Sequence, residues 1–141
     1  MKTLPSFKIV ILEDDDFYNR LLSKYLKNAL SELGIVRGFN LELTSYTSYR
    51  DCTLNFENDT LLLFTDYYLK NGYCASNIIE FINMRGSECK IIVVSQIQNL
   101  QTAICTILEG ATDFIKKDKH TLRQCQDIAE TIITEKLAYK N

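Results

Sequence analysis

Apolar residues along the chain gather in short runs that alternate with stretches of helical spacing. Three runs are continuous rather than alternating, which is typical of strands buried on both faces of a parallel sheet: residues 8–12, 61–64 and 90–94. Residues 39–46 alternate apolar and polar positions and predict a more exposed strand, and residues 111–117 predict a last one. The pattern therefore indicates five strands.

Between these runs, apolar residues recur every three or four positions and predict helices. For the first helix, Asp16 is the expected N-cap, with Asp15 as the alternative, and Gly34 is the expected end. A shorter helix is expected near residues 48–56. The apolar faces of the four longer helices comprise Phe17, Leu21, Leu22, Tyr25, Leu26, Ala29, Leu30 and Leu33; Ile78, Ile79, Phe81 and Ile82; Leu100, Ala103, Ile104, Ile107 and Leu108; and Leu122, Cys125, Ile128, Ala129, Ile132 and Ile133.

The strict alternation of strands and helices predicts an α/β fold, an open doubly wound parallel sheet of five strands with helices on both faces. The chain has 141 residues, which suits one domain over residues 1–141 with a core of about 7–138. It contains no internal repeat, low-complexity segment or linker.

Charge and cysteine usage exclude several function classes. The formal net charge is -2 and no cluster of lysine or arginine occurs, which argues against direct DNA binding and against a membrane surface. The five cysteines form no Cys-x-x-Cys pair and His120 is the one histidine, which argues against a zinc site. We take the cysteines as small core hydrophobes in a reduced, cytoplasmic protein without a secretion signal.

Polar residues follow four of the five predicted strands at the point where each strand ends. In open α/β sheets, ligands bind outside the carboxyl ends of the strands, so these residues are expected to converge at one site. They are Glu13, Asp14 and Asp15 after the first strand, Asp66 after the third, Ser95 after the fourth, and Lys116 and Lys117 after the fifth.

The acidic residues in this set need positive charge nearby. Two carboxylates about 4 Å apart repel by roughly 4 kcal/mol at an effective dielectric of about 20. A lysine supplies one charge, and Mg²⁺ supplies two while accepting carboxylates, waters and a phosphate oxygen. An aspartate beside Mg²⁺ can act as a nucleophile on phosphorus and form an acyl phosphate. The pattern therefore favours a site that receives a phosphoryl group.

Four motifs together resemble the receiver domains of two-component response regulators, in particular receivers like the chemotaxis regulator. They are "KIVILEDDD" for the first strand and acidic pocket, "LLLFTDYYLKNG" for the third strand and its phosphoacceptor, "KIIVVSQ" for the fourth strand and "GATDFIKKD" for the fifth. The resemblance covers nearly the whole chain and implies the flavodoxin-like strand order 2-1-3-4-5.

The resemblance also implies a role for each site residue. Asp66 would be the phosphoacceptor. Glu13, Asp14, Asp66 and the backbone carbonyl of Tyr68 would be ligands of Mg²⁺, with Mn²⁺ as an alternative metal. Lys117 would pair with the phosphoryl group.

Two further residues would form the switch that reports phosphorylation. Ser95 would turn toward the phosphoryl group together with the loop after the fourth strand, and Phe114 would follow. The face of the fourth helix, fifth strand and fifth helix would then change its affinity for a partner.

The implied function is a signalling switch rather than an enzyme with a separate substrate. A sensor histidine kinase or a histidine phosphotransfer protein would donate the phosphoryl group, and the domain would catalyse its own phosphorylation and dephosphorylation at Asp66. Its output would be a downstream protein or an output domain, with a homodimer through the switch face as a further option. Both a stand-alone receiver and part of a longer regulator fit the sequence.

Three other functions were considered, one because some residues depart from the receiver pattern and two because related folds support them. A receiver fold that binds proteins without phosphorylation, a pseudo-receiver, is suggested by residues unusual for the family. A phosphatase of the haloacid dehalogenase type would need a second aspartate where Tyr68 stands, and a flavin-binding protein would need a phosphate loop where acids follow the first strand. The residues that favour the pseudo-receiver are Lys70, Cys74 and Gln96, and Asp118 is a further departure from the family pattern.

Overall fold

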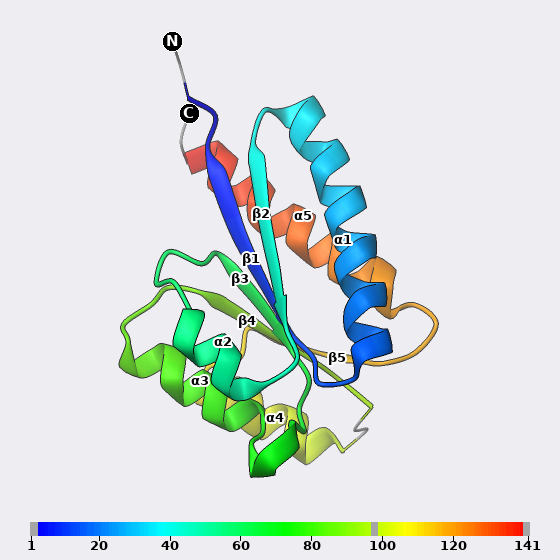
Figure 1. The fold of residues 1–141 in the computed structure, drawn as a ribbon, viewed down its shortest axis with the longest axis vertical. Helices are drawn as coiled ribbons and strands as arrows, with labels where there is room; N and C mark the ends of the chain where they lie inside the picture. Colours follow the sequence, from blue (N-terminus) through cyan, green and yellow to red (C-terminus); the bar gives the residue numbers. More distant parts are fainter. Residues whose placement is uncertain (1–2, 97–98, 140–141) are drawn as a thin grey trace.

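The computed structural model describes residues 3–96 and 99–139. These residues form a five-stranded parallel sheet of order β2-β1-β3-β4-β5 with α-helices on both sides (Figure 1), which confirms the predicted fold class and strand order. The elements are β1 Ser6–Leu12, α1 Asp16–Arg37, β2 Asn40–Tyr46, α2 Tyr49–Asn55, β3 Leu62–Thr65, a 3-10 turn at Lys70–Gly72, α3 Ala75–Met84, β4 Lys90–Ser95, α4 Leu100–Glu109, β5 Asp113–Lys116 and α5 Thr121–Tyr139.

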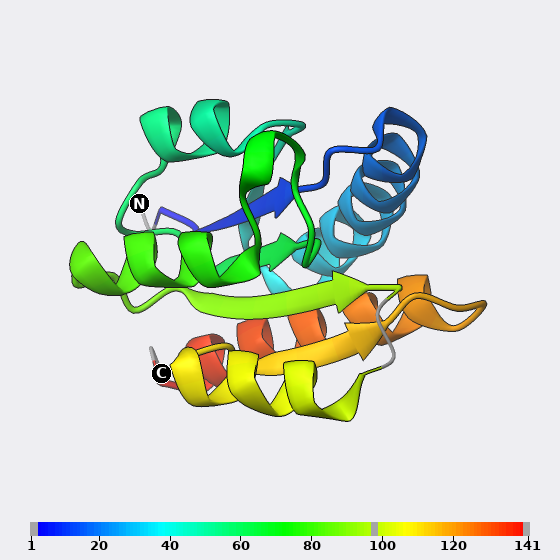
Figure 2. The ribbon, with the colours of Figure 1, turned by 90° about the horizontal axis from the view of Figure 1, so that it is seen from below.

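The helices form two layers that enclose the sheet. Helices α1 and α5 cover one face, and α2, α3 and α4 lie on the other (Figure 2). Successive side chains of β1 alternate between the layers: Ile9 and Ile11 pack toward α1 and α5, whereas Val10 and Leu12 pack toward α2 and α3. Because both faces are covered, the central strands are apolar on both faces over residues 9–12, 62–64 and 91–94, as their continuous runs predicted.

Helix α1 differs at both ends from the expectation. Its N-cap is Asp15, whose carboxylate accepts a hydrogen bond from the backbone of Tyr18, so the assignment to Asp16 was wrong. The helix also continues past Gly34 and ends at Gly38, which adopts a left-handed φ of 83°. Gly34 serves packing instead, because a Cβ there would lie 2.6 Å from the carbonyl oxygen of Phe39.

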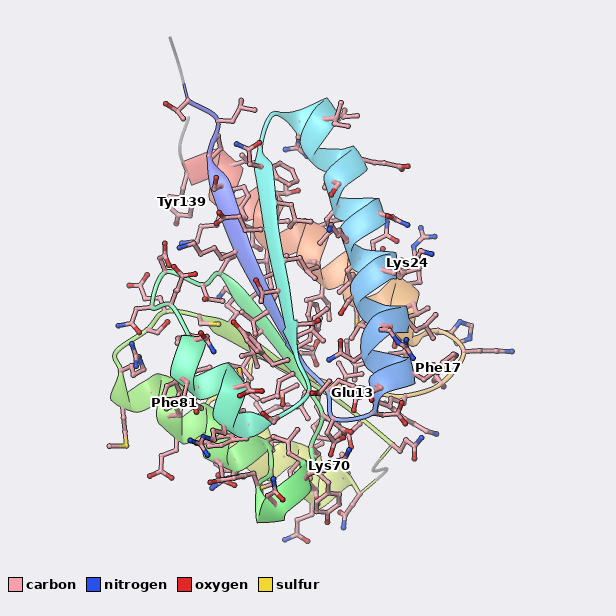
Figure 3. The ribbon with its side chains drawn as sticks, viewed as in Figure 1. Glu13, Phe17, Lys24, Lys70, Phe81 and Tyr139 are labelled. Carbon is pink, nitrogen blue, oxygen red and sulfur yellow. The ribbon has the colours of Figure 1, made fainter. Side chains whose placement is uncertain are left out.

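The buried stripe of α1 is also rotated relative to the predicted apolar face. Leu22, Leu26 and Leu30 are buried as expected, and Asn19 joins them. Phe17 and Leu21 are exposed to solvent. The first turn of α1 therefore presents apolar side chains outward, next to the end of the sheet where β1 stops, and Figure 3 shows the labelled Phe17 on this outer side.

Helix α4 forms where predicted, but its apolar face is not covered. Leu100 and Leu108 are exposed by 75% and 81%, and Ile104 and Ile107 by about half. Of the ten α4 residues, all of which the structure describes, Thr106 alone is buried. The helix lies at the end of its layer, against α3 and the edge strand β5, so most of its surface has no neighbour.

The cysteines divide into two groups, and all five are free thiols. Cys52, Cys89 and Cys125 are buried, as expected for small core hydrophobes. Cys105 lies exposed on α4, which contradicts that expectation, and Cys74 is half-buried. In the part of the chain that the structure describes, no helix has the length and apolar character needed to cross a membrane.

Candidate functional site

The strand register brings the predicted site residues to one edge of the sheet. Leu12 in β1 pairs with Thr65 in β3, so Glu13 and Asp66 follow at the same level. The backbone N–H of Asp66 donates to the carbonyl of Leu12 at 3.1 Å, which fixes the acid beside the end of β1. In Figure 3 the labelled Glu13 lies where β1 passes into α1, close to the loop that carries Lys70.

Three carboxylates meet at this edge. One oxygen from each of Glu13, Asp14 and Asp66 lies within 4.8 Å of the others, and Glu13 is buried while the two aspartates are half-buried. Oxygen ligands at this separation suit a hard divalent cation, so the donor set fits Mg²⁺ or Mn²⁺. Tyr68 lies two positions after Asp66, and its side chain is 67% exposed.

Lys117 supplies the positive charge of the cluster. Its Nζ donates to Glu13 Oε1 at 2.5 Å and to Asp66 Oδ2 at 3.3 Å, and only 10% of its side chain is exposed. Burial lowers the pKa of Lys117, but the hydrogen bond that it donates to Glu13 and the charges of the two carboxylates outweigh burial and raise it overall. The lysine is therefore a firmly charged cation within the acidic cluster.

The pKa of Glu13 is subject to opposing influences from its surroundings. The pKa of its carboxyl is raised to about 7, because burial and the charge of Asp66 together outweigh the hydrogen bond and the charge of Lys117, which lower it. The ammonium group of Lys117 thus stabilises the charged form of Glu13, whereas burial favours the neutral form. Additional positive charge at the site would stabilise the Glu13 carboxylate further.

Ser95 and Phe114 occupy the neighbouring strands. Ser95 is the last residue of β4 and is buried, and its carbonyl accepts the backbone N–H of Lys117 at 2.8 Å. Phe114 in β5 pairs with Val93 and packs half-buried against the core on the α2 and α3 face. The loop expected to move with Ser95 includes residues 97–98, which lie outside the described residues.

Solved structures similar to this chain are receiver domains. A receiver domain of a putative Luxo repressor from Vibrio parahaemolyticus has a TM-score of 0.75 at 18% identity over 94% of this chain and 95% of its own. A receiver domain from Clostridium thermocellum has a TM-score of 0.71 at 19% identity over 94% and 98%. CheY in a CheX-CheY-BeF3-Mg complex from Borrelia burgdorferi has a TM-score of 0.69 at 18% identity over 89% and 88%.

The chain has the receiver fold. No protein-family model matches its sequence, and no curated protein matches it significantly. The receiver fold of this chain is thus evident from the arrangement of its elements, while sequence identity to the solved receivers stays below 20% in these comparisons.

One residue beside the acidic cluster was not predicted from the sequence. Asn19, buried in the first turns of α1, donates through its amide to the carbonyls of Glu13 at 3.0 Å and Tyr46 at 2.9 Å. It ties the loop after β1 to the end of β2 and so positions the acidic pair. The signal was a polar residue on the buried stripe of Leu22 and Leu26.

The loop after Asp66 is fixed by a tight turn and by a stack of two aromatic rings. Asn71 and Gly72 both adopt left-handed backbone conformations, with φ of 65° and 80°, which is the pattern of a tight hairpin turn. The N–H of Leu69 donates to the carbonyl of Tyr73 at 3.0 Å, and the Tyr73 ring stacks on Tyr49 with centroids 4.0 Å apart. The stack joins this loop to the start of α2.

Proposed function

We propose that the chain is a phosphoacceptor receiver that takes a phosphoryl group onto Asp66 from the phosphohistidine of a histidine kinase or of a histidine phosphotransfer protein. The observation that carries this proposal is the grouping of three carboxylates with the largely buried Lys117 at the carboxyl ends of β1, β3 and β5. The similarity in fold to a BeF3-activated receiver domain supports it.

The transfer is a displacement at phosphorus. An oxygen of Asp66 forms a bond to phosphorus while the bond from phosphorus to the donor nitrogen breaks, and the nitrogen keeps the electron pair. Glu13, Asp14, Asp66 and the backbone carbonyl of Tyr68 would hold Mg²⁺ or Mn²⁺, which supplies positive charge for the phosphoryl oxygens when bound. Lys117, 3.3 Å from Asp66 Oδ2, supplies the other charge. Attack by water later returns the carboxylate.

Phosphorylation adds about one and a half to two negative charges to the site, and Lys117 can follow that charge away from Glu13. Ser95 and Phe114 then pass the change to the face of α4, β5 and α5. The exposed apolar residues of α4 give that face a surface for a protein partner or for a second copy of the chain. The response is a shift between conformations set by the preference of the phosphoryl group.

We also place the protein in the cytoplasm, without direct contact to DNA or membrane. Five free thiols suit a reducing compartment, and the net charge of -2 gives no basic surface for nucleic acid.

A second candidate is the pseudo-receiver, a module that binds proteins without being phosphorylated. The specific observation in its favour is the pairing of Lys117 with both Glu13 and Asp66, because this pairing neutralises part of the acidic cluster without a metal ion. Such a module would not depend on Mg²⁺.

Intact-mass spectrometry after incubation with acetyl phosphate separates the two candidates. We expect a Mg²⁺-dependent gain of one phosphoryl group in the wild type and none in Asp66→Asn. Asp16→Asn is the matched control, because Asp16 is an exposed acid beside the site and is expected to behave as wild type. No gain with acetyl phosphate or with a phosphohistidine donor, or an equal gain in Asp66→Asn, would overturn the receiver proposal and favour the pseudo-receiver.

A further inference from the structure

The ammonium group of Lys117 has a third neighbour besides the two carboxylates. Its Nζ lies 4.3 Å from the centroid of the Tyr18 ring, on the ring face. A cation within about 6 Å of an aromatic face is attracted by the negative potential of the ring. Glu13, Asp66 and Tyr18 therefore surround the ammonium from three separate segments: the loop after β1, the loop after β3, and α1.

Tyr18 is held firmly on its own side. Its backbone N–H donates to the N-cap carboxylate of Asp15 at 2.9 Å, which fixes the first turn of α1. Its half-buried ring packs against the core between α1 and α5, and burial raises the pKa of its phenol. The ring thus has little freedom to turn away from Lys117.

The segment after Lys117 is more exposed than the surroundings of Tyr18. The residues between β5 and α5, Asp118, Lys119 and His120, are exposed. Thr121 closes this turn by accepting the N–H of Asp118 at 2.7 Å and donating to the carbonyl of Lys116 at 3.1 Å. A lysine stem has several rotatable bonds, so a charged head group in one place must be held by its surroundings.

We propose that the face of the Tyr18 ring is a positioning element that keeps the Lys117 ammonium at the site. This inference rests on the proposed function, in which Lys117 exchanges Glu13 for a phosphoryl oxygen. Attraction to a ring face depends less on direction than a hydrogen bond does, so it persists while the ammonium changes its anionic partner. The two carboxylates attract the ammonium more strongly, but one of them must release it during transfer.

The structure also permits a plainer role, in which the ring merely covers the lysine stem. Two substitutions separate the roles. Tyr18→Phe keeps the ring face and removes only the hydroxyl, whereas Tyr18→Leu keeps apolar bulk and removes the ring. Tyr25→Leu is the matched control, because Tyr25 lies two turns further along α1 and packs against the same core.

The first measurement is the rate of phosphorylation by acetyl phosphate at saturating Mg²⁺. We expect Tyr18→Leu to be about three- to tenfold slower than wild type, the range expected from a partly buried cation–π contact, with unchanged half-saturation by Mg²⁺. Tyr18→Phe and Tyr25→Leu should stay within about twofold of wild type. A wild-type rate in Tyr18→Leu, or equal slowing in Tyr18→Phe, would overturn the inference.

The second measurement does not depend on phosphorylation. The ε-methylene protons of Lys117, assigned by their loss in Lys117→Met, should show an upfield ring-current shift by NMR in the wild type and in Tyr18→Phe. The shift should vanish in Tyr18→Leu. If the wild type takes no phosphoryl group, the proposed function fails while this shift still decides where Tyr18 holds the lysine; absence of the shift in the wild type would refute the positioning role.

Discussion

Helices α3 and α4 have the same length and similar apolar content, yet the tertiary structure treats them differently. Helix α3 buries Ala75, Ile78, Ile79 and Ile82 against the sheet. Helix α4 buries Thr106, whose hydroxyl is satisfied by the carbonyls of Thr102 and Ala103 within the helix itself, and exposes its isoleucines and leucines. An apolar face therefore shows what a helix can bury, and its place in the layer decides what it does bury.

The position of each helix explains the difference. Helix α3 lies between α2 and α4 over the middle of the sheet, whereas α4 ends the layer over β4 and the short edge strand β5 (Figure 2). The exposed face of α4 belongs to the surface that we propose as the output of the switch. The weakly covered helix and the proposed output surface thus coincide.

The largest contrast concerns thiol reactivity. Cys89 belongs to the same core cluster as the buried residues of α3, and burial raises the pKa of its thiol to about 12, whereas Cys105 on α4 is exposed. At about pH 8 a thiol with its pKa raised from the usual value near 8.5 stays protonated and unreactive. We expect iodoacetamide to label Cys105 about a thousandfold faster than Cys89, measured by peptide mass spectrometry.

This contrast also has a defined pH dependence. Labelling of Cys89 in the folded protein should rise with pH toward its raised pKa, because only the thiolate reacts. Equal labelling of Cys89 and Cys105 at about pH 8 in the folded protein would contradict the comparison, because it would mean that the core beneath α3 is as accessible to solvent as the surface of α4.

Truncating one isoleucine in α3 and one in α4 tests how much each helix contributes to the free energy of unfolding. Ile78→Ala in α3 should lower the free energy of unfolding by about 2–4 kcal/mol, because it removes fully buried atoms and leaves a cavity. Ile107→Ala in α4 should lower it by less than about 1 kcal/mol, since Ile107 is 46% exposed. Urea unfolding measures both, and similar losses would show that the α4 face is covered in solution.

The smallest effect concerns the link between the two helices. The Ser76 hydroxyl at the start of α3 donates to the Glu109 carboxylate at the end of α4 at 2.9 Å, on the surface. Ser76→Ala should cost only about 0.5 kcal/mol overall, the usual worth of an exposed hydrogen bond. Amide hydrogen exchange should become about twofold faster in α4 and stay unchanged in α3. Faster exchange confined to α3 would contradict the view that α4 is the less stably packed of the two helices.

The candidate site was predictable in outline from local patterns. Continuous apolar runs identify buried parallel strands, and the ends of such strands meet at one edge. Glu13, Asp66 and Lys117 lie together for this reason, although 51 residues separate Asp66 from Lys117 in the chain. Their roles in phosphoryl transfer stay predictions until the mass measurement is made.

The supporting contacts were not predictable in the same way. Spacing along α1 placed Phe17 and Leu21 on the apolar face, but the structure exposes both and buries Asn19. Asn19 bonds the carbonyl of Tyr46, 27 positions away, and this contact with β2 has no trace in the spacing along α1. Tyr18, next to Asn19, faces Lys117, which lies still further along the chain.

The sequence by itself determined the order of strands and helices and the placement of acids and a lysine after particular strands, because these depend on local spacing and chain direction. Only the tertiary structure decided that α4 keeps its apolar face exposed, that Tyr18 lies against Lys117 and that Asn19 bonds the loop after β1. Coverage and side-chain contacts depend on neighbours brought from elsewhere in the chain. A helix at the edge of a layer lacks such neighbours, whatever its own pattern.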